Sequence, residues 1–92
     1  MPGRKKSAPA SIYSVYLVAY VNEATRARAE RGEWITHLEE FTPILFYMGN
    51  SRLQAERHFS RAALAAMNNP LAYAVVMYRD LEVLIRLRVD RP

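Results

Sequence analysis

The sequence predicts an α+β fold in which an antiparallel sheet of four to five strands carries one principal helix. Residues 51–67 have a helical pattern, with a capping signal before it and a proline after it. Two β-type runs, 71–78 and 82–89, follow and are separated by a tight-turn signal. Another β-type run, 12–21, begins the ordered part of the chain. The expected order of elements is β-β-β-α-β-β.

Residues 12–21 are expected to form a central strand, because alternation divides them into two largely apolar faces. The faces are Tyr13, Val15, Leu17, Ala19 and Val21 on one side, and Ser14, Tyr16, Val18 and Tyr20 on the other. A strand that is apolar on both faces is typical of the middle of a sheet. We therefore expect a helix on one side, and a partner sheet or second subunit on the other.

Residues 22–31 contain good helix formers but no apolar stripe larger than alanine. We expect a charged hairpin arm or loop, with a short exposed helix as the alternative, ending at Gly32. Alternation resumes over 33–40, which predicts a further strand. Phe41-Thr42-Pro43 should break or bend it, since proline cannot donate to a central ladder, before a short strand over 44–48.

The helix over 51–67 has the clearest pattern in the chain. Asn50-Ser51 supplies its cap, and Pro70 forbids its continuation. The expected buried stripe is Ala55, Phe59, Ala62, Ala63, Ala66 and Met67. After the helix, a tight turn near Arg79-Asp80-Leu81 joins the last two strands. On the last strand, Arg86 and Arg88 share a face.

Size and composition indicate one small domain over residues 12–92, preceded by a flexible basic arm over 1–11. Domains of this size often complete their core by pairing, so we expect a homodimer. The chain has no cysteine, which excludes disulfides and thiolate chemistry and fits a reducing cytoplasm. No apolar run approaches the length of a membrane span, so we expect no membrane partner.

The charge balance points to an acidic partner. The net charge is +4, from 13 Lys and Arg against 9 Asp and Glu. Arginine predominates, and its planar guanidinium suits phosphate and carboxylate, although a GC-rich genome would also enrich it. We expect a non-enzymatic module that binds nucleic acid or a nucleoprotein complex. The expected binding residues are Arg57, Arg61, Arg86, Arg88, Arg4, Lys5 and Lys6.

Catalytic, metal and cofactor sites have little support in the sequence. His37 and His58 lack partners at metal-ligand spacing, and we expect both to be solvated. Glu39 and Glu40 are adjacent, so in a strand their side chains would point to opposite faces. We therefore expect no catalytic residue, metal or cofactor.

Two other functions remain open. One is a protein-protein interaction module, such as a mobile-element-encoded inhibitor or adaptor of a host complex. Its contact residues would be Tyr16, Tyr20, Trp34, Phe41 and Phe46. The other is a metal-independent RNA endonuclease of the toxin type. Its residues would come from the last hairpin, namely Tyr73, Tyr78, Arg79, Arg86 and Arg88.

Overall fold

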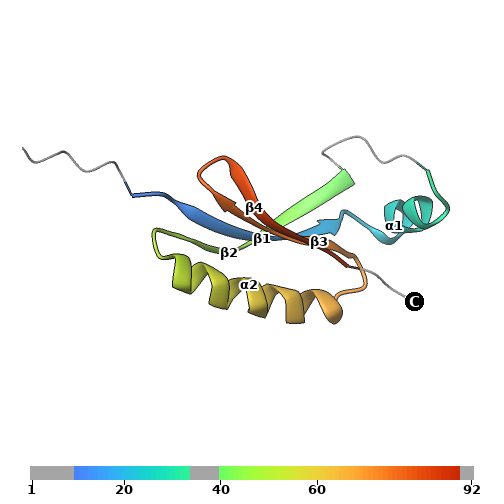
Figure 1. Cartoon of the computed structure of the whole chain (residues 1–92). Helices are drawn as coiled ribbons and strands as arrows, with labels where there is room; N and C mark the ends of the chain where they lie inside the picture. The colour runs from blue at the N-terminus through green and yellow to red at the C-terminus, as the bar shows by residue number, and fades with distance from the viewer. Residues whose placement is uncertain (1–9, 34–39, 90–92) are drawn as a thin grey trace, which may run out of the picture.

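The computed structural model describes residues 10–33 and 40–89 and has a four-stranded antiparallel sheet with two helices (Figure 1). This confirms the predicted α+β fold. The elements in chain order are β1 (Tyr13–Tyr20), α1 (Glu23–Glu30), β2 (Phe41–Gly49), α2 (Arg52–Met67), β3 (Ala72–Arg79) and β4 (Glu82–Arg88). The expected strand over 33–40, with Trp34, His37 and Glu39, lies mostly outside the described residues, as does the arm with Arg4, Lys5 and Lys6.

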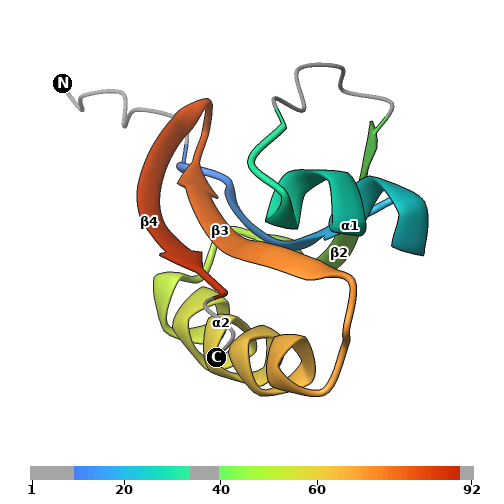
Figure 2. The ribbon, with the colours of Figure 1, turned by 90° about the vertical axis from the view of Figure 1, so that its right-hand side faces the viewer.

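The sheet has the order β2-β1-β3-β4, so β1 is the central strand that its two apolar faces predict. β1 pairs antiparallel with both β2 and β3, which makes those two neighbours parallel to each other. α2 makes the crossover between them and packs against one face of the sheet (Figure 2). α1 lies beyond the end of β1, on the side away from α2 (Figure 2).

The hydrophobic core lies between α2 and the face of the sheet that it covers, which we call the covered face. Its largest fully buried side chains are Leu17, Met77, Val15 and Val75, from β1 and β3. On α2 the buried residues are Ala55, Phe59, Ala62 and Ala66. Alanines at these positions let the helix approach the sheet closely, as the helical stripe predicts. Met67, expected in the stripe, is instead exposed.

The start of α2 is fixed by the turn after β2. Ser51 is the N-cap, and its hydroxyl accepts a hydrogen bond from the Gln54 amide at 3.1 Å. The Ser51 amide donates to the Tyr47 hydroxyl at 3.2 Å. That hydroxyl lies over Gly49, where a Cβ atom would be only 2.5 Å from it. A side chain at Gly49 would therefore displace the tyrosine that orients the helix start.

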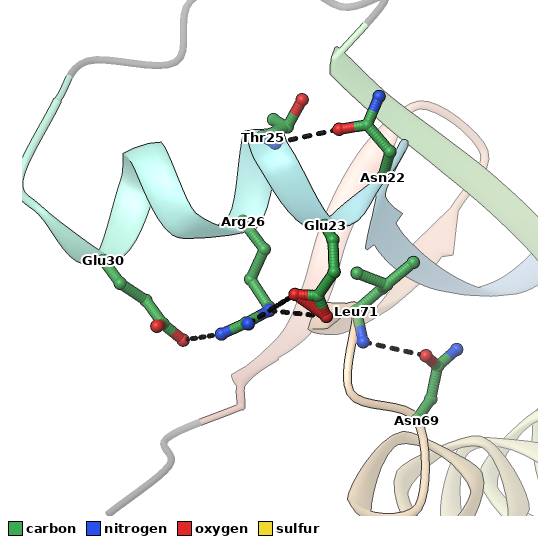
Figure 3. Close-up of polar contacts among 7 residues, drawn as sticks. All are labelled: Asn22, Glu23, Thr25, Arg26, Glu30, Asn69 and Leu71. Carbon is green, nitrogen blue, oxygen red and sulfur yellow. Dashed lines mark hydrogen bonds and ion pairs between the residues drawn. The ribbon is translucent and has the colours of Figure 1, made fainter.

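Residues 23–30 form a helix, so the expected hairpin arm is wrong. Asn22 caps it, accepting a hydrogen bond from the Thr25 amide at 2.9 Å (Figure 3). Arg26 forms ion pairs with Glu23 and Glu30, one turn before and one turn after it (Figure 3). Capping and local ion pairs stabilise α1 where no apolar stripe does. The helix is followed by Gly32 at φ 88°, a conformation that favours glycine.

β2 runs without interruption through Pro43, which the sequence had placed at a break. The physical reason is its position: β2 is an edge strand, where the missing amide of proline is tolerated.

The last two strands form the predicted hairpin, with its turn at Asp80-Leu81 between Arg79 and Glu82. Asp80 has a φ of 56°, which aspartate tolerates better than most residues. Its amide donates to the Ile12 carbonyl at 2.7 Å, and its Oδ1 accepts from the Ile12 amide at 3.0 Å. The turn is thus tied to the start of β1.

Among the described residues, no helix has the length and apolar character needed to cross a membrane.

Candidate functional site

The face of the sheet that points away from α2, which we call the open face, is the most distinctive surface of the molecule. Strand register assigns it the side chains that alternate with the core residues. They include Ser14, Tyr16, Val18, Tyr20, Phe41, Pro43, Leu45, Met48, Tyr73, Val76, Tyr78, Arg86 and Arg88. Among the described elements outside the sheet, α1 approaches one end of this face.

Aromatic rings form two groups on the open face. At the α1 end, Tyr20, Phe41 and Tyr73 come from three adjacent strands, with ring centroids 5.1–5.5 Å apart. At the other end, Tyr16 and Tyr78 meet edge to face at 6.0 Å. Tyr73 and Tyr78 are five residues apart on β3, or about 16 Å along an extended strand. The open face therefore carries two separate aromatic platforms.

Arg86 and Arg88 border these platforms on β4. Arg86 pairs in register with Val76, next to the middle of the face, and Arg88 pairs with Ala74. The guanidinium carbon of Arg88 lies 4.8 Å from the centroid of the Tyr73 ring, which is cation–π geometry. Both arginine side chains are exposed.

Ion pairing separates the arginines into two sets. Arg26, Arg28, Arg31, Arg52 and Arg79 each pair with a glutamate. Among residues 10–33 and 40–89, the arginines that form no ion pair are Arg57, Arg61, Arg86 and Arg88. These are the arginines of the described region that the sequence nominates for phosphate contact.

The structure divides those four arginines between two surfaces. Arg57 and Arg61 are exposed on α2, one turn apart. Arg86 and Arg88 lie on the open face, on the opposite side of the sheet. One ligand lying on the open face would therefore meet the β4 pair but not the α2 pair.

A hollow of about 400 Å³ opens at the Tyr16–Tyr78 end of the open face. Its walls are mostly apolar, and its polar lining comes from Ser14, Asp80 and the tyrosines. Ser14, in the lining, is only 7% exposed. A second hollow of about 260 Å³ lies under α1, and Tyr20, Tyr73, Arg88 and Glu33 are among its lining residues.

Burial shifts the pKa of one side chain on the open face, Tyr20. Desolvation and the neighbouring Tyr73 raise the pKa of Tyr20 above its ordinary value, and the positive charge of Arg88 partly opposes this rise. The phenol of Tyr20 is thus neutral at physiological pH, where it can both donate and accept a hydrogen bond.

The remaining predicted contact residues take different positions. Tyr16, Tyr20 and Phe41 lie on the open face, whereas Phe46 packs against the core under α2. Of the endonuclease residues, Tyr73 and Tyr78 lie in separate aromatic groups, and Arg79 is paired with Glu82.

His58 is half-buried and stacks on Tyr47, with ring centroids 5.2 Å apart, which differs from the solvated position that we expected. In the part of the chain that the structure describes, no group of three or more His, Cys, Asp or Glu side chains is placed to hold a metal ion.

The sequence did not identify Ser14 and Asp80 as site residues. Asp80 could have been found from its place in a tight hairpin turn, where aspartate is common. Ser14 had no signal other than being the one polar residue on its face of the central strand.

No protein-family model, curated protein or solved structure matches the chain.

Proposed function

We propose that this protein is a binding module for single-stranded nucleic acid, with the open face as its platform. The observation that carries the proposal is the stacked Arg88–Tyr73 pair, which puts an aromatic ring and a guanidinium without an ion pair among the described residues on one exposed surface. Single strands are bound by this combination, in which aromatic rings stack on bases and cations follow the backbone.

The aromatic groups would take the bases. Tyr73, with Tyr20 and Phe41, offers ring surface at one end of the face, and Tyr16 with Tyr78 offers it at the other. Stacking of one base on a protein aromatic contributes about 1–3 kcal/mol and does not depend strongly on base identity. Two platforms about 16 Å apart suit a strand of several nucleotides.

Arg86 and Arg88 would contact the phosphates. Their charge is not neutralised by any carboxylate of the described residues, unlike that of Arg79 in the neighbouring turn. They lie at the β4 edge of the same face as the rings. Arg57 and Arg61, on the other side of the sheet, are outside the proposed path and provide a matched control.

The test is a fluorescence-anisotropy titration of labelled eight-nucleotide RNA and DNA strands over a range of salt concentrations. Each lost phosphate contact on a single strand reduces the slope of log affinity against log salt by about 0.7. The Arg86→Ala/Arg88→Ala variant should therefore lose about 1.4 units of slope. Arg57→Ala/Arg61→Ala removes the same charge and should keep the slope.

Equal loss in the two double variants would mean that net charge, and not the open face, determines binding. Absence of binding to any strand at low salt would rule out the proposal. We expect the strand to remain intact, and cleavage that Arg86→Ala or Tyr78→Phe abolishes would support a ribonuclease instead.

A protein partner on the open face is the second candidate, with another copy of this chain as the simplest case. It is favoured by the β2 half of the face, where Leu45 and Met48 are 52% and 56% exposed. The edges of the sheet are poor alternatives for pairing, because β2 contains Pro43 and β4 carries a bulge and two arginines.

Light scattering at micromolar concentration distinguishes the two candidates. A homodimer would have twice the chain mass of 10.6 kDa. If it forms through the open face, Leu45→Lys should return it to the monomer, and an oligonucleotide should compete with it. A mass of 10.6 kDa at high concentration would exclude the homodimer and leave the face free for another partner.

A further inference from the structure

We infer that the hollow at the Tyr16–Tyr78 end of the open face selects a guanine base from the bound strand. This inference rests on the proposed function and specifies the ligand of one part of the same site. The walls of the hollow are mostly apolar, whereas Ser14 and Asp80 add polar groups to its lining.

The walls suit a flat aromatic ligand. Tyr16, Tyr78, Val18, Pro43 and Leu81 supply apolar and aromatic surface. A volume of about 400 Å³ is within the range of small-molecule pockets, roughly 300–1,000 Å³. A base that leaves the stack of its own strand would find its ring surface covered here, as in other proteins that read unstacked bases.

The Asp80 carboxylate supplies the selectivity. Its Oδ1 already accepts the Ile12 amide at 3.0 Å, which orients the side chain. Its Oδ2 accepts no hydrogen bond from the described residues, and an ionised carboxylate can only accept. The group therefore favours a base that presents N–H donors at its edge.

Guanine fits this requirement better than the other bases. Its Watson–Crick edge has two adjacent donors, the ring N1–H and the exocyclic amino group. Uracil presents one N–H between two carbonyl oxygens, which a carboxylate would repel. The Ser14 hydroxyl, also in the hollow, can donate to the O6 atom that guanine carries beside its donors.

The variant that tests this is Asp80→Asn. Asparagine tolerates the positive φ of this turn, and its amide oxygen can still accept the Ile12 hydrogen bond. The substitution places an amino group where the Oδ2 atom of Asp80 was. A hydrogen-bond acceptor is thus replaced by a donor, with little change in the shape of the side chain. The fold should be retained, which a melting curve would verify.

The experiment compares an eight-nucleotide uridine strand with the same strand carrying one central guanosine. The wild-type protein should bind the guanosine strand about fivefold more tightly or better, the low end for a two-point base contact. Asp80→Asn should bring that ratio to about one, and the ratio cancels the effect that the lost negative charge has on both strands.

The outcomes separate the two proposals. Binding of both strands with equal affinity by the wild-type protein, or a preference that survives in Asp80→Asn, would overturn the guanine pocket and leave the platform standing. Failure of both strands to bind would overturn the platform, and the pocket with it.

Discussion

The two faces of the sheet are built from the same strands and differ in almost every physical property. On the covered face, Val15 and Val75 are completely buried and Leu17 is 2% exposed, with no polar atom in any of the three side chains. On the open face, their neighbours Tyr16 and Tyr20 are half-buried and keep their hydroxyls. Strand alternation thus gives one face to the core and leaves the other uncovered by α2.

The comparison shows why both faces look apolar in the sequence. Tyrosine and valine satisfy the same alternation, and a ring that packs on its neighbours hides part of its surface without being in the core. The property that separates the faces is charge: the guanidiniums of Arg86 and Arg88, which form no ion pair with the described residues, occur on the open side. Disruption of the covered face should therefore cost stability, whereas changes to the open face should cost binding.

The largest expected effect is on the covered face, from Ala62→Pro. Ala62 is completely buried in the middle of α2, and proline there removes a hydrogen bond and clashes with the preceding turn. The cost of about 3 kcal/mol or more is a large share of the stability of so small a domain. Thermal melting by circular dichroism should show loss of the folded state.

Arg61→Ala is the control for that change, because it alters the neighbouring position on the exposed side of the helix. It should melt as the wild-type protein does. An unchanged melting temperature for Ala62→Pro would contradict the packing of α2 described here.

An intermediate effect is expected on the open face, from Tyr73→Leu. The change removes the ring on which Arg88 stacks but retains an apolar side chain. Binding of a single strand should weaken by about 1–3 kcal/mol, the contribution of one stacked base. Tyr73→Phe keeps the ring and should bind nearly as well, and titration by fluorescence anisotropy would measure both.

A Tyr73→Leu variant that binds with wild-type affinity would show that the strand does not pass over this end of the face. If both Tyr73 variants lost binding equally, the hydroxyl, and not the ring, would be the important group.

Much of the fold could be predicted from local signals. The cap at Ser51, the alanine stripe and the turn at Asp80 each reside in a few consecutive residues, and the structure has all of them. The two errors in secondary structure, at Pro43 and over 23–30, had non-local or compensating causes. Pro43 is accommodated because β2 is at the edge, which depends on strand order, and α1 is stabilised by the Asn22 cap and the ion pairs of Arg26.

The candidate site was less accessible to sequence reasoning, because it depends on which strands are neighbours. Arg86 and Tyr16 are far apart in the chain and share a face only because β3 lies between β1 and β4. Arg57 and Arg86 lie on opposite sides of the sheet, because α2 packs against the covered face and Arg86 lies on the open face. The arginines and tyrosines could be identified from the sequence, but their position together on one face of the sheet could not.

The smallest expected effect is a pH dependence of stability that comes from Tyr20. Because burial raises the pKa of its phenol in the folded protein, the folded state holds this proton more tightly than the unfolded state does. Its stabilising contribution is complete below the unfolded pKa of about 10 and is lost as pH rises through the higher folded pKa. Urea unfolding midpoints between pH 9 and 11 should thus fall less steeply for Tyr20→Phe than for the wild-type protein.

In the same urea unfolding measurement, Arg88→Ala should have the opposite effect to Tyr20→Phe. The guanidinium of Arg88 lowers the pKa of Tyr20, so its removal should raise that pKa further. The loss of stability should still begin at the unfolded pKa, but it should continue to higher pH and be larger in total. Spectrophotometric titration of the tyrosinate absorbance would follow the same group directly, with Tyr20→Phe as the reference. Identical pH profiles for the wild-type protein and Tyr20→Phe would mean that the Tyr20 phenol is as well solvated in the folded protein as in the unfolded chain. The α1 end of the open face would then be less closed than the packing of Tyr20 with Phe41 and Tyr73 indicates.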